Sequence, residues 1–205
     1  MDKKKISEKY NLIYTNIKNA FGSKPYFLVK NFVKYKRTGK VIDAGCGDGR
    51  NSIFLAKKGY IVSAIDLSEI AINKIKNKSK LLNLDLNLEI NDVRDILLKK
   101  QFDIVISTFI SQYFDKKSFL KFIVKMQNCT EIKGIHVISF MNDQSNFKSA
   151  INNNWYLPST VDIVSLYKNW QILEISETKS DVYSKNNTLI KNSYVVATNL
   201  ILKKI

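Results

Sequence analysis

Short apolar runs alternate with amphipathic segments along most of the chain. Each run has the length and the β-branched content of a buried strand. Between the runs, apolar residues recur at steps of three and four, which is typical of helices with one buried face. The pattern predicts strands at 40–44, 60–66, 86–90, 102–107 and 134–140, and helices at 51–58, after Ser68, and at 116–127.

The two ends of the chain depart from this alternation. Near the N-terminus, residues 7–21 place apolar side chains on one face of a predicted helix, and a second short helix is predicted to begin at Pro25. Residues 141–159 form a polar, irregular stretch that is long enough for a functional loop. The remaining predicted elements are a short helix opening at Pro158 and Ser159 and an antiparallel hairpin of strands at 170–177 and 193–202.

Strands that alternate with helices predict a parallel sheet covered by helices on both faces. The length of 205 residues suits one domain, which can bury a sizeable core without stapling. We therefore expect a single domain, 1–205, of the α/β doubly wound class.

A glycine-rich turn follows the first predicted strand, in the stretch VIDAGCGDGRNS. Three of the chain's 7 glycines fall there, at Gly45, Gly47 and Gly49. In open α/β sheets, ligands bind outside the carboxyl ends of the strands, where loops lead into helices with unpaired N–H groups. Glycine lets the backbone turn with positive φ and lets a ligand approach it closely. The third glycine of a dinucleotide fingerprint would fall at Arg50, and no GK[ST] follows, so neither a NAD site nor a Walker loop is predicted.

Acidic residues end the next two strands. Asp66 closes the second strand in AIDLS, where a carboxylate can accept hydrogen bonds from the hydroxyls of a ribose. The third strand ends in NDV, where Asp92 can accept from an adenine amino group and the Val93 N–H can donate to the ring, with Leu67 packing on its face. The three strand ends together predict a nucleoside site.

Composition changes this picture little. The net charge of +15 attracts nucleic acid or an acidic partner in principle. However, only Arg37, Arg50 and Arg94 are arginines among the 33 basic residues, and the lysines are scattered along the chain. Arginine is the preferred residue for bidentate contacts with phosphate and guanine, so nucleic-acid binding is not favoured.

The cysteine and histidine residues and the distribution of apolar residues argue against a metal site and against a membrane segment. Cys46 and Cys129 lack a metal or redox spacing, and His136 is the only histidine, so we predict no metal site. The charged N-terminal residues do not resemble a signal peptide, and the sequence has no 18-residue apolar run. We expect a soluble cytoplasmic protein that does not associate with a membrane.

The motifs VIDAGCGDGRNS, AIDLS, NDV and FDIVIST resemble the cofactor motifs of class I S-adenosylmethionine-dependent methyltransferases. The resemblance covers roughly residues 7 to 204. Within that superfamily, the Arg-Asn pair after the third glycine, the segment STFISQYF and the ending AxNLILKK look most like the tellurite-resistance methyltransferases and their thiopurine-methyltransferase-like relatives. The resemblance implies a Rossmann-like sheet of seven strands, mostly parallel, with an antiparallel C-terminal strand.

The resemblance also implies a cofactor, S-adenosyl-L-methionine, and its product, S-adenosyl-L-homocysteine. Asp43 would orient the methionine amino group, and the glycine turn would pass beneath the methionine and ribose. Asp66 would bind the ribose, Asp92 with Val93 would hold the adenine, and the end of the fourth strand would line the sulfonium side. The implied cofactor-binding residues are Asp43, Gly45, Cys46, Gly47, Arg50, Asn51, Asp66, Leu67, Asp92, Val93, Ser107 and Thr108.

Methyl transfer from a sulfonium is an in-line displacement, so the enzyme mainly holds the reactants in line, and this orientation is worth roughly 7–11 kcal/mol. A thiolate or selenide acceptor needs no base. Aromatic faces would favour the sulfonium charge, and Tyr10, Tyr14, Tyr113 and Phe114 could provide them. The candidate catalytic residues are Tyr14, Tyr113 and Trp155. We interpret His136 and Cys46 as structural residues.

These implications divide the domain into four parts: an N-terminal helical lid at 1–38, the cofactor-binding core at 39–140, a substrate loop at 141–158, and a C-terminal helix and β-hairpin at 159–205. Trp155 and Tyr156 give the loop an aromatic area that we expect to cover the substrate. The related tellurite enzymes carry a histidine between the last two strands, where this chain has Tyr183.

The segment after the fourth strand narrows the class of methyl acceptor. Its residues, STFIS, differ from the [ND]PP[YF] loop with which similar enzymes stack a flipped base. We therefore favour a small-molecule acceptor, including soft sulfur, selenium or tellurium nucleophiles. Two alternatives stay open: an RNA or protein methyltransferase that uses the lysine-rich surface, and a non-catalytic module that binds an adenosyl ligand.

Overall fold

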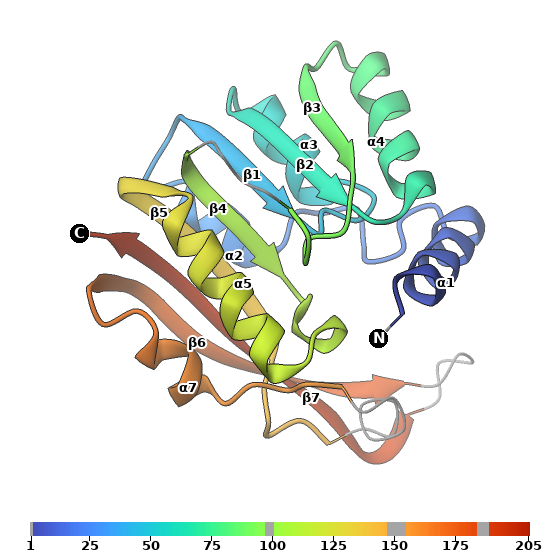
Figure 1. Ribbon diagram of the computed structural model, residues 1–205. Coiled ribbons are helices and arrows are strands. Elements are labelled where there is room, and N and C mark those ends of the chain that lie inside the picture. Colours follow the sequence, from blue (N-terminus) through green and yellow to red (C-terminus); the bar gives the residue numbers. More distant parts are fainter. Residues whose placement is uncertain (1, 97–100, 147–154, 184–188) are drawn as a thin grey trace.

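The computed structural model describes residues 2–96, 101–146, 155–183 and 189–205. Seven strands form one sheet in the order β3-β2-β1-β4-β5-β7-β6 (Figure 1). The strands are β1 (Lys40–Ala44), β2 (Ile61–Asp66), β3 (Leu86–Ile90), β4 (Phe102–Thr108), β5 (Thr130–Met141), β6 (Trp170–Tyr183) and β7 (Leu189–Lys204). The helices are α1 (Lys3–Asn16), α2 (Phe27–Phe32), α3 (Arg50–Lys57), α4 (Glu69–Leu81), the 3₁₀ helix η1 (Ser111–Tyr113), α5 (Lys116–Asn128) and α7 (Thr160–Ser165).

The sheet is mostly parallel, as predicted. β1 pairs in parallel with β2 and β4, and the parallel pairing continues to β3 on one side and β5 on the other. β7 inserts between β5 and β6 and runs antiparallel to both. The predicted doubly wound α/β fold with an antiparallel C-terminal strand is confirmed.

Helices cover both faces of the sheet. On one face, α5 and α7 pack over the sheet with buried residues such as Phe122, Met126 and Ile163 (Figure 1). On the other face, α2, α3 and α4 bury residues such as Phe32 and Leu55. The central strands contribute alternate residues to the two clusters, because successive side chains of a strand point to opposite faces.

The N-terminal helix differs from its predicted bounds. It begins at Lys3, where the Asp2 side chain caps the first turn by accepting from the Lys4 N–H, and it ends at Asn16. Phe21 therefore lies in a turn after the helix. Its spacing in the sequence indicated a shared helical face, but its ring meets those of Tyr10 and Tyr14 by folding back, with centroid distances of 6.4 and 6.2 Å.

The predicted lid, residues 1–38, divides into two different environments. α1 lies at the carboxyl edge of the sheet (Figure 1), whereas α2 is part of the core. Leu28, Val29 and Phe32 of α2 are fully buried against β5 and β7. α2 is therefore a core helix, because its three apolar residues cover the sheet.

The C-terminal strands are longer than predicted. β6 runs to Tyr183 and β7 begins at Leu189, so strand structure extends into the segment whose composition indicated a turn. Polar residues suit this position, because β6 is an edge strand whose outer side faces solvent. The side chain of Tyr183, and residues 147–154 of the predicted substrate loop, lie outside the described residues. Among the described residues, no helix combines the length and apolar character needed to cross a membrane.

Candidate functional site

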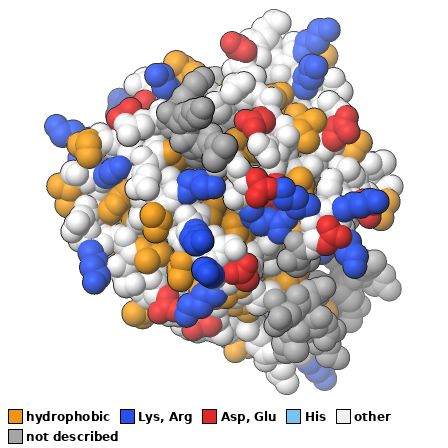
Figure 2. Space-filling view, in the orientation of Figure 1, with side chains coloured by type: hydrophobic (Ala, Val, Ile, Leu, Met, Phe, Trp, Pro, Cys, Tyr) orange, Lys and Arg blue, Asp and Glu red, His pale blue; other side chains and the backbone are white. Residues whose placement is uncertain are grey.

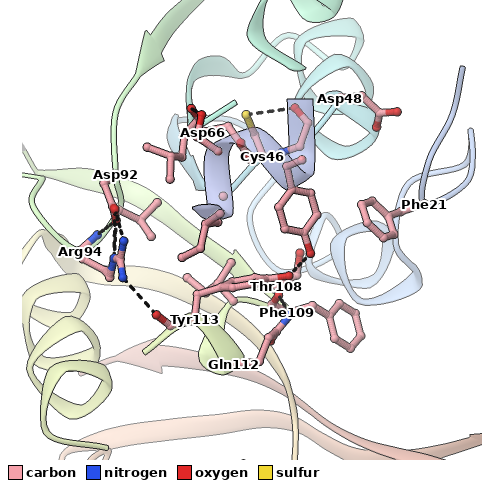
Figure 3. A pocket seen from close by; sticks show the side chains of 18 of the residues that line it. Phe21, Cys46, Asp48, Asp66, Asp92, Arg94, Thr108, Phe109, Gln112 and Tyr113 are labelled. Atoms are coloured by element: carbon pink, nitrogen blue, oxygen red, sulfur yellow. Dashed lines mark hydrogen bonds and ion pairs between the residues drawn. The ribbon is translucent and has the colours of Figure 1, made fainter. Parts of the chain in front are cut away.

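A cavity of about 550 Å³ opens at the carboxyl ends of the first four strands. Its walls come from α1 and from the turns that follow β1, β2, β3 and β4. Figure 3 shows the side chains that line it. Ten of the residues implied as cofactor-binding line it: Gly45, Cys46, Gly47, Arg50, Asn51, Asp66, Leu67, Asp92, Val93 and Thr108. Asp43 and Ser107 do not. The three aromatic candidates Tyr14, Tyr113 and Trp155 all line the cavity.

The backbone conformation and the packing of neighbouring side chains explain why three positions of the turn are glycines. Gly45, Gly47 and Gly49 have φ angles of 77°, 56° and 81°, in the left-handed region that disfavours other residues. A Cβ on Gly47 would lie 2.7 Å from the Tyr14 hydroxyl, and a Cβ on Gly45 would lie 2.6 Å from Ile110. Neighbouring side chains therefore require glycine at these positions, and Gly45 and Gly47 also line the cavity, so the close approach of a ligand to the turn stays a prediction.

Asp66 ties the glycine turn to the second strand. Its Oδ2 accepts from the Gly47 N–H at 2.8 Å, and its Oδ1 accepts from the Ser68 N–H at 2.9 Å. Burial raises the pKa of Asp66, although these backbone hydrogen bonds oppose the shift. Each carboxylate oxygen has two acceptor sites, so Asp66 retains capacity toward the cavity.

Asp92 is held by a neighbour that the sequence analysis did not single out. The Arg94 guanidinium donates to both oxygens of the Asp92 carboxylate, from Nη2 at 2.6 Å and from Nε at 2.9 and 3.0 Å, and the Arg94 backbone N–H donates to Oδ1 (Figure 3). Burial alone would raise the pKa of Asp92, but the hydrogen bonds and charge of Arg94 outweigh it and lower the pKa. Asp92 therefore stays ionised and fixed in orientation.

Asp43 lies directly behind the glycine turn and is 1% exposed. Ser52 on α3 donates to its Oδ2 at 2.6 Å, while its Oδ1 has no hydrogen-bond partner among the described residues. Burial raises the pKa of Asp43 to about 6. A buried carboxylate with an unpaired oxygen is costly, and a cationic group beside the turn would relieve that cost.

Arg50 and Asn51, at the start of α3, face the N-terminal part of the chain. Arg50 Nη1 donates to the Phe21 carbonyl oxygen, and Asn51 Oδ1 accepts from the Tyr26 N–H at 2.9 Å. Both residues also line the cavity. The structure thus assigns them a contact within the protein in addition to the implied role toward a cofactor.

Aromatic rings from three parts of the chain meet over the cavity. Tyr10 on α1 packs against Tyr14 and Tyr113 with centroid distances of 5.9 and 5.6 Å, and the hydroxyls of Tyr10 and Tyr113 are hydrogen-bonded to each other. The Lys9 ammonium lies 5.7 Å from the ring centroids of both Tyr10 and Trp155. The rings offer their faces to a cation, although each also packs against its neighbours.

The cavity holds few groups that can act as a base. Burial raises the pKa of Tyr10 to about 12 and raises that of Tyr14 further. Cys46 is buried, and burial raises its pKa as well, which agrees with the packing role that we predicted. His136 lies outside the cavity, fully buried between the Tyr167 hydroxyl at 2.6 Å and Ser107 Oγ at 3.3 Å. Burial lowers its pKa to about 3.

Ser107 faces away from the cavity because alternate residues of β4 point to opposite faces. It contacts His136, whereas Thr108 lines the cavity. Among the described residues, no three His, Cys, Asp or Glu side chains come close enough together to hold a metal ion.

Several residues that line the cavity were not predicted from the sequence. Asp48 lies inside the glycine turn and Arg94 lies two positions after Asp92, so both were close to residues that we considered. Phe109 and Gln112 follow β4, and Phe109 adopts a φ of 56°. A positive φ at a phenylalanine has no signature in the sequence.

The order of the strands and the position of the cavity define the class I methyltransferase fold. Solved structures share it. The crystal structure of TehB from Haemophilus influenzae aligns with a TM-score of 0.76 at 22% identity and covers 88% of this chain and 62% of that chain. The N-methyltransferase NodS from Bradyrhizobium japonicum WM9, in complex with S-adenosyl-L-homocysteine, aligns with a TM-score of 0.72 at 12% identity and covers 97% of each chain.

The family described as "Tellurite resistance protein TehB" matches residues 2–196, and the chain belongs to this family. The probable S-adenosyl-L-methionine-dependent methyltransferase TehB of Haemophilus influenzae (strain 10810) is 26% identical over 167 residues, which are 80% of this chain and 57% of the relative. The chain therefore spans little more than half the length of this curated relative. A ubiquinone biosynthesis O-methyltransferase of Coxiella burnetii (strain Dugway 5J108-111) is 42% identical over 67 residues, which are 32% of this chain and 28% of the relative.

Proposed function

We propose that the chain is an S-adenosylmethionine-dependent methyltransferase that acts on a small, soft acceptor. The observation that carries the proposal is that the glycine turn, Asp66 and Asp92 border one and the same cavity, with Asp43 directly behind the turn. Family membership supports the same activity.

The residues around the cavity fit this cofactor. Asp66 and Asp92 would bind the ribose hydroxyls and the adenine amino group. The unpaired Oδ1 of Asp43 would attract the methionine ammonium through the turn, directly or through water, and so gain the cationic neighbour that it lacks within the described residues. The cavity volume of about 550 Å³ is in the usual range for ligand pockets.

The cofactor supplies a methyl group activated on a sulfonium. The chain's own residues would fix the adenosyl part at one end of the cavity, so that the reacting atoms are held in line. Tyr14 and Tyr113 would present ring faces toward the positive charge, and the apolar walls from Phe109 and Met141 would exclude water.

The polar groups that line the cavity indicate the acceptor class. Among the described lining residues, the three carboxylates are already hydrogen-bonded: Asp48 to Ala20, Asp66 to Gly47 and Ser68, and Asp92 to Arg94. The Tyr10, Tyr14 and Cys46 protons are held more tightly than usual. An acceptor that is nucleophilic without deprotonation, such as a thiolate or a selenium or tellurium anion, suits these surroundings best.

The lysine-rich surface is the observation that favours the second candidate, methylation of RNA or an acidic protein. Basic side chains are spread over the face in Figure 2 and are interspersed with acidic ones. A mixed surface of this kind provides weaker long-range attraction than one continuous basic patch.

The experiment is a methyl-acceptor screen of the purified chain with thiols, selenite, tellurite, small metabolites and RNA, preceded by calorimetry with S-adenosyl-L-homocysteine. Turnover of a small soft acceptor that changes little with salt supports the proposal. Turnover of RNA alone, with a steep loss of activity as salt rises, would replace it by the second candidate. Binding of the adenosyl ligand without any turnover would indicate the non-catalytic module.

A further inference from the structure

Polar side chains of the glycine turn and of the start of α3 bind a segment of the chain and also line the cavity. This connecting segment, residues 17–26, joins α1 to α2. Asp48 Oδ2 accepts from the Ala20 N–H at 3.1 Å, Asn51 Oδ1 accepts from the Tyr26 N–H at 2.9 Å, and Arg50 donates to the Phe21 carbonyl oxygen. Asp48 of the turn and Arg50 and Asn51 of α3 thus satisfy three backbone groups of one segment.

Two further contacts join the same parts. The Arg50 guanidinium lies 5.6 Å from the centroid of the Tyr26 ring. The Tyr14 hydroxyl, just before the segment, packs so closely on Gly47 that a Cβ there would lie 2.7 Å away. The segment itself lacks a helix or strand, so its position depends on side-chain contacts. These are the contacts above, at its later residues, and a hydrogen bond at its start, where Lys74 Nζ on α4 donates to the Ile17 carbonyl oxygen at 2.7 Å.

The connecting segment lies at one end of the cavity. Figure 3 shows Asp48 and Phe21 on the side opposite Asp92 and Arg94. Under the proposed function, Asp92 marks the adenine end, so Asp48 and Phe21 mark the end where the methionine part and the acceptor meet. Phe21 lines the cavity although it is half exposed, and it is kept there by the position of the segment and by the ring contacts with Tyr10 and Tyr14.

We propose that Asp48, with Arg50 and Asn51, is a positioning residue that fixes the connecting segment over the acceptor end of the cavity. The turn that would bind the cofactor thereby also holds the connecting segment over the acceptor end of the cavity. Closing this end strengthens the binding of groups located there and leaves binding at the adenine end unchanged. This inference rests on the proposed function only for the identity of the two ends.

Asp48 is the residue to change, because it is bound to the segment and is not among the implied cofactor-binding residues. In Asp48→Ala, the Ala20 N–H loses its acceptor, and we expect trypsin to cleave after Lys18 about tenfold faster, because cleavage follows the population of the open segment. Asp48→Asn keeps an acceptor oxygen and should restore slow cleavage. Asp85→Ala, an exposed aspartate next to β3, is the matched control for the change in charge.

Calorimetry with two probes then separates the ends of the cavity. S-adenosyl-L-homocysteine reaches both ends, whereas adenosine lacks the homocysteine part. Asp48→Ala should weaken S-adenosyl-L-homocysteine binding about tenfold and leave adenosine binding unchanged, and Asp48→Asn should restore the affinity. Three results would overturn the inference. Asp48→Ala could lose affinity equally for both probes, or it could keep the wild-type cleavage rate and affinity. Asp48→Asn could also behave like Asp48→Ala. If wild-type protein binds neither probe, the proposed function fails, and the cleavage rates still test the contact.

Discussion

The substitution Asp43→Asn measures how much the ionised carboxylate behind the glycine turn lowers the free energy of unfolding. Asp43 is 1% exposed, and burial raises its pKa from 3.8 to about 6. A carboxyl group with a raised pKa in the folded state stabilises the fold when it is protonated. That stability is fully present below the unfolded pKa of about 4 and is lost as the pH rises through about 6. Because one pKa unit corresponds to about 1.4 kcal/mol, the shift of about two units amounts to about 3 kcal/mol.

The assay is urea unfolding of the wild type and Asp43→Asn at several pH values. The unfolding free energy of the wild type minus that of the variant should fall by about 2.4 kcal/mol between pH 4 and pH 7, because only the wild type must ionise the buried group, and the rest of the loss occurs below pH 4. Taking the difference removes the contribution of the other acids. In Ser52→Ala, which removes the hydrogen bond to Oδ2, the fall should extend to higher pH. A difference that stays within about 0.5 kcal/mol across this range would refute the reasoning.

Three further predictions concern groups whose contacts the structure defines. Asp66→Ala should weaken S-adenosyl-L-homocysteine binding about ten- to hundredfold in calorimetry, and unaltered affinity would contradict the assignment. The variant should also have a lower Tm, because the Gly47 and Ser68 N–H groups lose their acceptor. Gly47→Ala should destabilise the fold by about 2 kcal/mol more than Gly59→Ala in urea unfolding, because both glycines have positive φ but only a Cβ at position 47 meets the Tyr14 hydroxyl. Adding Tyr14→Phe to Gly47→Ala should recover part of the loss, and equal losses in the two glycine variants would exclude the clash. His136, neutral with a pKa of about 3, should make the unfolding free energy fall as the pH drops below 6.5, and His136→Asn should flatten that acid limb.

The sequence was sufficient for the order and type of most elements. Strand β3 has the predicted bounds, and α4 begins after Ser68, whose hydroxyl accepts from the Ala71 N–H as expected of a cap. These features depend on local pattern, which a sequence displays directly. The length of the C-terminal strands depends instead on their pairing with each other and with β5, so it was underestimated.

The candidate site was predictable where residues directly follow a strand. Gly45, Asp66 and Asp92 come together because the carboxyl ends of parallel strands share one edge of the sheet. The partners of these residues were not predictable. The contact between Arg94 and Asp92 depends on the orientation of the Arg94 side chain, which the sequence does not show. The contact of Asp48 with Ala20 joins two positions that come together only in the folded chain.

The carboxylates around the cavity are compensated to different degrees, and this difference bears on what the cavity selects. Asp92 is paired with the Arg94 guanidinium, and Asp66 accepts two backbone N–H groups. Asp43 has one hydroxyl donor and one unpaired oxygen. Only Asp43 therefore gains much from a cation, and a ligand with an ammonium beside the turn would be bound most strongly when Asp43 is ionised. Affinity for S-adenosyl-L-homocysteine should rise from pH 5 to pH 7 in the wild type and stay level in Asp43→Asn, whereas adenosine, which lacks the ammonium, should bind with the same affinity at both pH values.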